Sequence, residues 1–119
     1  MFLMGKKLEV LDQIDSQFIS RMSSKGFNQS ETVFLFFTQK LFPLSYLKEA
    51  IQTGEKLEAS VSLFNVKFRV PISTIYSGAT RLEEKGYLKK RLGGYGNFVQ
   101  YILNVKLLHD LFSDLEAEN

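Results

Sequence analysis

Cysteine is absent from this sequence of 119 residues, and several kinds of site are excluded with it. Disulfides, thiolate nucleophiles and the sulfur-rich zinc sites all require cysteine. The sequence also lacks any run of about 18 apolar residues, and too few apolar residues precede the first lysines to form a signal peptide. We therefore expect a soluble, cytoplasmic protein without membrane contact. The length suits one domain spanning residues 1–119.

The chain as a whole has little excess charge of either sign, because its formal net charge is only +2. Its distribution is uneven, however. Residues 67–91 contain seven basic and two acidic side chains, whereas residues 92–119 contain one basic and four acidic side chains. A positive field concentrated in one segment favours a polyanionic partner at that segment.

The first half of the chain is predicted to be helical. Apolar residues at three- and four-residue spacing predict an amphipathic helix over residues 8–22. Ser30 is expected to cap a second helix that ends near Phe42, although Val33–Phe37 alone would also suit a buried strand. Residues 44–51 have the pattern of a short helix, and Lys56 to Ala59 that of a short strand or an extended segment.

Two short helical patterns follow each other within residues 60–85. Apolar residues recur at helical spacing in both: Val61, Phe64 and Phe68 in the first, and Ile75, Ala79 and Leu82 in the second. Only Arg69–Pro71 separates the two patterns, which is the spacing of a tight helix-turn-helix. At about 100° per residue, Gly78 joins the inward side of the second helix.

The outward side of the second helix carries the candidate DNA-binding residues. These are Ser73, Thr74, Tyr76, Ser77, Thr80 and Arg81. Hydroxyl, phenol and guanidinium groups can contact phosphates or base edges, and small side chains allow a helix to enter a major groove about 12 Å wide. The alternative interpretation is a solvated helix face, with Tyr76 as a half-buried packing residue.

Residues 87–103 have the pattern of a β-hairpin with a glycine-rich tip, following Gly86 as a helix-ending residue. Five of its side chains are candidates for contacts with a phosphate backbone or a minor groove: Lys89, Lys90, Arg91, Tyr95 and Asn97. Alternatively, the three cations form a charged edge that deters aggregation, and Tyr95 packs against the core.

The segment from Val70 to Arg91, and RLEEKGYL within it above all, resembles the recognition helix and wing of MarR-like transcriptional regulators. A weaker similarity connects GFNQSET, at residues 26–32, with the amino-terminal winged-helix domain of DnaD. The resemblance implies an α+β, mostly helical fold: a winged helix-turn-helix with a two- or three-stranded antiparallel wing and flanking helices at both ends. It also implies a homodimer formed through the first helix and the last, predicted at residues 105–115.

No catalytic residues, cofactor or metal site are expected. His109, the single histidine, lies among apolar residues of the last predicted helix and suits a surface or packing position. The glycines at the hairpin tip lack the sequence of a phosphate-binding loop. We therefore predict a dimeric, sequence-specific regulator of transcription, most simply a repressor, that binds double-stranded DNA. The alternative is a winged-helix module of a plasmid or phage replication, partition or conjugation complex that acts through protein contacts.

Overall fold

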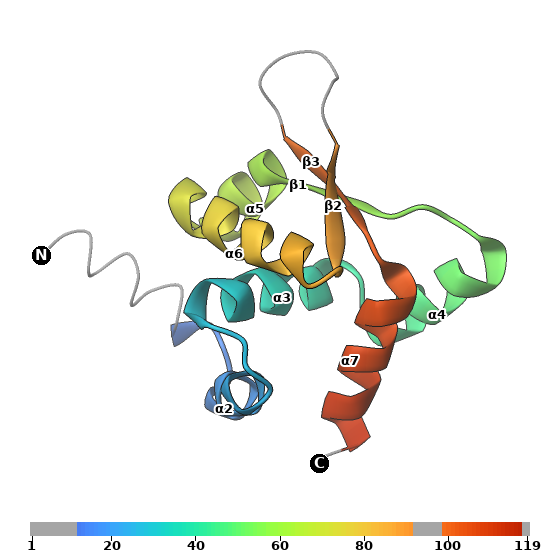
Figure 1. Ribbon diagram of the computed structural model, residues 1–119, viewed down its shortest axis with the longest axis horizontal. Coiled ribbons are helices and arrows are strands. Elements are labelled where there is room, and N and C mark those ends of the chain that lie inside the picture. The colour runs from blue at the N-terminus through green and yellow to red at the C-terminus, as the bar shows by residue number, and fades with distance from the viewer. Residues whose placement is uncertain (1–11, 92–98, 118–119) are drawn as a thin grey trace, which may run out of the picture.

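The computed structural model describes residues 12–91 and 99–117 (Figure 1). The described helices are α2 (Ser16–Ser24), α3 (Gln29–Leu41), α4 (Leu44–Thr53), α5 (Val61–Phe68), α6 (Ile72–Glu84) and α7 (Val105–Ala117). The described strands are β1 (Glu58–Ser60), β2 (Leu88–Arg91) and β3 (Gln100–Leu103). The predicted α+β, mostly helical class is confirmed for these residues.

Helix α3 lies in the middle of the molecule, between α2 and α6 (Figure 1). Val33–Phe37 lies within this helix and all five of its residues are buried, so the helical interpretation of this segment is confirmed. The expected cap was wrong, because Asn28 and not Ser30 caps the helix. The Asn28 side chain accepts the N–H of Glu31 at 2.8 Å, and Glu31 Oε1 accepts the N–H of Asn28 at 2.9 Å. This reciprocal pair satisfies two donors at the start of the helix.

The prediction of one continuous helix over residues 8–22 was wrong. Helix α2 begins at Ser16, and Asp15 before it has a non-helical backbone conformation. The Asp15 carboxylate accepts the N–H of Gln17 at 2.9 Å, so it caps α2 and does not continue an earlier helix. Ile14 is nevertheless buried, as its place in the apolar pattern indicated. Residues 8–11 of this prediction lie outside the described part of the chain.

Helices α5 and α6 occupy the predicted places and are joined by Arg69–Pro71. The inward side of α6 is also as predicted, because Ile75, Gly78, Ala79 and Leu82 are all buried. Gly78 allows α6 to approach the start of α3 closely: a Cβ at this position would lie 2.4 Å from the Ser30 carbonyl oxygen. The position of α6 on the core therefore depends on a residue without a side chain.

The three described strands form an antiparallel sheet in the order β1-β3-β2. Leu88 pairs with Leu103 and Arg91 pairs with Gln100, so the predicted strand pairing of residues 87–103 is confirmed. The predicted strand near residues 56–59 is β1, which adds a third strand beside β3. Gly86 has a φ of 86° between α6 and β2, a conformation that glycine adopts without strain.

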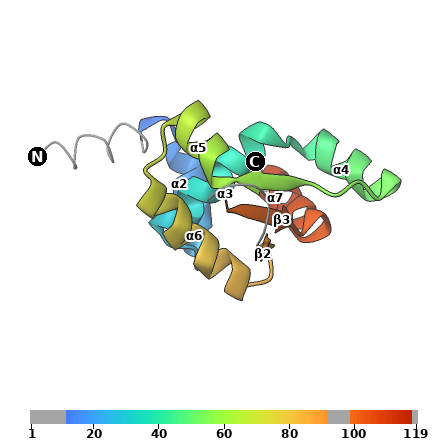
Figure 2. The same ribbon diagram turned by 90° about the horizontal axis from the view of Figure 1, so that it is seen from above.

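Helices α4 and α7 pack against each other at the end of the molecule away from the start of α6 (Figures 1 and 2). The apolar side of α7 is buried within the same chain: Leu108, Leu111, Phe112 and Leu115. Any dimer contact made by α7 would therefore use its other side. Of the helices described, none has the length and hydrophobicity needed to cross a membrane.

Candidate nucleic-acid interface

A row of small hydroxyl side chains runs along the solvent side of α6. Ser73, Ser77 and Thr80 are exposed, and Arg81 beside them is exposed as well. These positions point away from Ile75 and its buried neighbours because they follow the 3.6-residue period of the helix. We call Ser73, Ser77, Thr80 and Arg81 the outer row of α6. The row presents hydrogen-bonding groups with little bulk.

Thr74 and Tyr76 flank the outer row and are half-buried. Tyr76 packs against the hydrophobic core, as the alternative interpretation of this residue indicated. The Tyr76 side chain lies on the side of α6 that faces the sheet, near Tyr101. Tyr76 therefore supports the junction between α6 and the sheet, while part of its surface stays accessible beside the outer row.

A hydrogen bond joins the end of α6 to strand β2. Glu83 Oε2 accepts the backbone N–H of Lys90 at 2.8 Å. Strand β2 lies at the edge of the sheet, so this N–H is not used in pairing with β3. The bond thus covers part of the open edge and fixes β2 beside α6. Helix α6 and strand β2 lie side by side (Figure 1), so the outer row and the exposed Lys90 belong to neighbouring parts of the surface.

The three cations of β2 do not share one face of the sheet. Side chains alternate along a strand, and Lys90 pairs with the buried Tyr101, so Lys90 lies on the side that faces α6. Lys89 and Arg91 lie on the opposite side. All three are exposed. Of these three predicted contacts, only Lys90 lies on the same side of the sheet as α6 and its outer row.

Arg91 is held by neighbouring strands. Its Nε lies 2.7 Å from Glu58 Oε1 on β1, and its guanidinium also donates a short hydrogen bond to Gln100 on β3. The side chain is about half exposed, so the pair with Glu58 is solvent-screened but still offsets the positive charge. Arg91 therefore contributes less to the positive field than the sequence indicated.

The charge of Lys85 is compensated more completely than that of Arg91. Its Nζ lies 2.7 Å from Glu31 Oε2, 3.2 Å from the Gly26 carbonyl oxygen and 4.4 Å from the centre of the Phe27 ring. The ammonium thus compensates a buried carboxylate at the start of α3. The exposed cations of this segment without an acidic partner among the described residues are Lys67, Arg69, Arg81, Lys89 and Lys90.

Two of these cations were missed as candidate site residues. Lys67 lies in the last turn of α5, and Arg69 follows the helix in a left-handed conformation with a φ of 59°. The Asn65 side chain donates to the Val70 carbonyl at 3.0 Å and fixes this turn. Both residues belong to the basic segment 67–91, so the charge count already pointed to them. The turn geometry that exposes them was not visible in the sequence.

Tyr101 lies directly opposite Lys90 on the neighbouring strand β3. Burial raises the pKa of Tyr101 to about 12, with smaller increases from Tyr76 and Glu83. The phenol is therefore uncharged at neutral pH and does not offset the charge of Lys90. Its ring packs edge-on against Phe34 at 5.9 Å, which connects the sheet to α3.

The remaining two predicted contacts, Tyr95 and Asn97, lie outside the described residues. Within residues 12–91 and 99–117 there is no group of three or more side chains suited to hold a metal ion. The candidate interface thus consists of the outer row, Lys90 and the cations of the α5–α6 turn.

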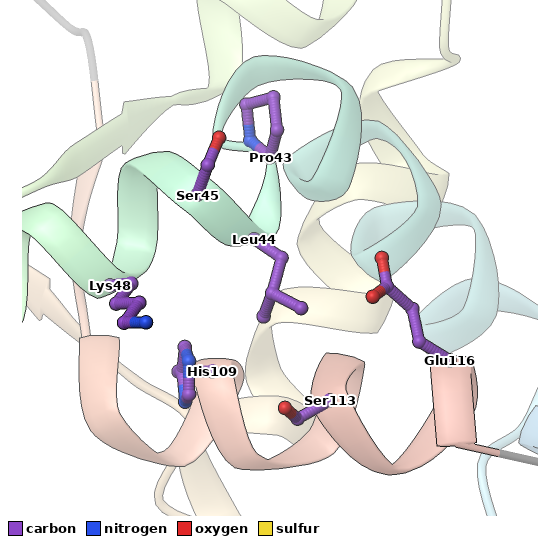
Figure 3. A pocket seen from close by; sticks show the side chains of 7 residues that line it. All are labelled: Pro43, Leu44, Ser45, Lys48, His109, Ser113 and Glu116. Atoms are coloured by element: carbon purple, nitrogen blue, oxygen red, sulfur yellow. The ribbon is translucent and has the colours of Figure 1, made fainter.

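A second surface lies between α4 and α7, away from α6 (Figure 3). It is an open groove of about 590 Å³ lined by Pro43, Leu44, Ser45, Lys48, His109, Ser113 and Glu116. Figure 3 shows Leu44 and His109 pointing into the space between the two helices. His109 Nδ1 lies 3.7 Å from the Asp110 carboxylate, and no hydrogen bond joins it to Ser113. The groove mixes apolar and charged side chains and has no arrangement of nucleophile and base.

Comparison of the chain with known protein families, with curated protein sequences and with solved structures found no match. The function is therefore inferred from the chemistry and arrangement of the two surfaces described above. The first has unpaired cations and an exposed helix with small polar side chains, whereas the second is of mixed charge. Their different chemistry favours different partners.

Proposed function

We propose that this protein is a winged helix-turn-helix regulator of the MarR kind that binds double-stranded DNA, with α5 and α6 as the helix-turn-helix and β2 and β3 as the wing. One observation carries the proposal: the outer row of α6 and Lys90 of β2 lie on one surface, which the bond from Lys90 to Glu83 holds together. A helix and a charged strand so arranged suit a groove and the phosphates beside it.

The shape of α6 supports entry into a major groove. Its 13 residues span about 20 Å at a rise of 1.5 Å per residue. Because the outer row consists of two serines, a threonine and one arginine, the helix backbone can approach the base edges. Serine and threonine hydroxyls accept or donate hydrogen bonds to several bases, and arginine favours guanine. We therefore assign base contacts to the outer row.

The unpaired cations support contacts with the DNA backbone. Lys90 lies on the wing, and Lys67 and Arg69 lie at the opposite end of the surface, at the turn before α6. Cations at both ends of a recognition helix suit phosphates on both sides of one groove. Such contacts are independent of sequence and give affinity a strong salt dependence.

The proposed regulator acts as a homodimer on two half-sites and represses by occluding a promoter. The resemblance to MarR-like proteins supports this part of the proposal. Since the apolar side of α7 is occupied within its own chain, the dimer contacts are assigned to other surfaces of the terminal segments. Sedimentation of the chain with and without a palindromic duplex measures the number of chains that bind.

The groove between α4 and α7 favours a second candidate function, a module that binds another protein. Its lining combines the apolar Leu44 with Lys48 and Glu116, so it offers apolar groups and charges of both signs to a partner, without the excess of positive charge that suits DNA. Under this hypothesis the groove, and not the outer row, makes the essential contact of the protein.

Selection from a random duplex library, followed by fluorescence polarisation at several salt concentrations, tests the proposal. We expect one enriched motif and an affinity that falls linearly with the logarithm of salt concentration. Ser77→Ala or Arg81→Ala should change the preferred bases, whereas Lys90→Ala should weaken all duplexes alike. Absence of salt-dependent binding to any duplex contradicts DNA binding and leaves the protein-binding module.

A further inference from the structure

Ile72 is an exception to the polar composition of the exposed part of α6. The other large apolar residues of the helix, Ile75 and Leu82, are 1% and 0% exposed, but Ile72 is 50% exposed. Unlike Tyr76, which lies one turn later on the same side, Ile72 is not packed against the core. A β-branched apolar side chain thus faces solvent at the first position of the helix, directly before Ser73 of the outer row.

The surroundings of Ile72 fit a DNA groove better than an apolar partner. Exposed Lys67 and Arg69 precede it, and neither has an acidic partner among the described residues. The helix begins after Pro71 without a side-chain cap, so the N–H groups of its first turn have no side-chain acceptor. Cations and free N–H groups around the side chain complement a polyanion.

Within a major groove, one base edge offers an apolar surface. The C5 methyl group of thymine projects there, whereas the other bases present hydrogen-bonding groups. An isoleucine at the leading end of a recognition helix would bury this methyl group and part of its own exposed surface. A cytosine at the same position has hydrogen in place of the methyl group, so the side chain would bury less apolar surface.

We propose that Ile72 is a specificity-determining residue that selects thymine in each half-site by contact with its C5 methyl group. This inference rests on the proposed DNA-binding function and adds one base preference to it. The contact supplies discrimination that the hydroxyls of the outer row lack, because these hydroxyls are tolerant of several bases.

Replacement of thymine by deoxyuridine tests the inference, because it removes the methyl group and retains the base-pairing groups. In the selected duplex, each thymine is replaced singly and affinity is measured by fluorescence polarisation. Burial of one methyl group predicts that the original chain loses about three- to fivefold in affinity at one thymine of each half-site. In Ile72→Ala, thymine and deoxyuridine at that position should bind equally.

Val66→Ala is the matched control. Val66 is 75% exposed and lies on α5, so it is apolar and accessible without belonging to α6. This variant should retain the preference for thymine, and both variants should keep the melting temperature of the original chain. The inference is wrong if no thymine is sensitive, if Ile72→Ala keeps the preference, or if Ile72→Ala changes only the number of chains bound.

Failure of the inference differs from failure of the proposed function. Salt-dependent binding to the selected duplex without any effect of deoxyuridine overturns the role of Ile72 and leaves DNA binding intact. Lack of binding to every duplex overturns both.

Discussion

Lys85 Nζ at the end of α6 lies 2.7 Å from Glu31 Oε2 at the start of α3. The Glu31 side chain is 2% exposed and the Lys85 side chain 39% exposed, so the carboxylate depends on the lysine for charge compensation. The same carboxylate completes the cap of α3 through Asn28. One ion pair thus connects α6, the central helix α3 and the turn before α3.

Removal of Lys85 should destabilise the fold more than removal of an exposed lysine of β2. Lys85→Met leaves the Glu31 carboxylate buried without its cation, and we expect a loss of about 2 kcal/mol in the free energy of unfolding. Lys89→Met should change that free energy by less than about 0.5 kcal/mol, because Lys89 is exposed. Chemical denaturation measures both.

A double variant tests the explanation. Glu31→Gln in the Lys85→Met background removes the unpaired charge while an amide oxygen can still accept from Asn28. Part of the lost stability should return. Equal stability of Lys85→Met and the original chain would show that the ion pair is dispensable.

Gly78 should tolerate no side chain. In Gly78→Ala the new Cβ would lie 2.4 Å from the Ser30 carbonyl oxygen, so α6 must move away from α3. Overpacking of this kind predicts a loss of about 2 kcal/mol, despite the higher helix propensity of alanine. Ser77→Ala, at the adjacent exposed position, is the control and should leave the thermal midpoint nearly unchanged. A Gly78→Ala protein as stable as the control would contradict the close contact.

The periodicity of apolar residues was enough to predict α6 and α7 and their buried sides. Ile75, Ala79 and Leu82 have the spacing of one helix face, and this face is buried as expected. Caps were harder to predict, because Asn28 and Ser30 are both good capping residues and only the chain path decides between them. Similarly, Asp15 ended a pattern that appeared continuous in the sequence.

The candidate site was predictable only in part, because charge counts ignore pairing. Lys85 and Arg91 added to the basic total of residues 67–91, yet Glu31 and Glu58 compensate them from distant positions in the chain. Charge counts also ignore that neighbouring side chains of a strand lie on opposite faces of the sheet. Lys90 faces α6 and Arg91 does not, a distinction that needs the register of the sheet.

This distinction predicts unequal effects of the two residues on DNA binding. Lys90→Ala should weaken binding to all duplexes and lower the slope of affinity against salt by about 1, as expected for one lost phosphate contact. Arg91→Ala should have a smaller effect, since Glu58 already offsets part of the guanidinium charge. Polarisation titrations over a salt series measure both slopes, and a larger effect of Arg91→Ala would contradict the assignment of Lys90 to the interface.

Tyr101 predicts a loss of stability in alkaline solution. Burial raises the pKa of Tyr101 from 10.0 to about 12, so folding is more favourable while the phenol is neutral than when it is ionised. The contribution is complete below about pH 10 and is lost as the pH rises towards about 12. Tyr101→Phe retains the ring and cannot ionise, so its stability should fall less over this range. Parallel loss of stability in the two proteins would show that other groups cause the alkaline transition.

The proposed DNA-binding surface is tested most directly by amide proton–nitrogen correlation spectra of the labelled chain during titration with the selected duplex. We predict salt-dependent shifts concentrated on Ser73, Ser77, Thr80, Arg81 and Lys90, with little change along α4 and α7. Shifts confined to the groove around Leu44 and His109, or no shifts with any duplex, would contradict the proposed interface.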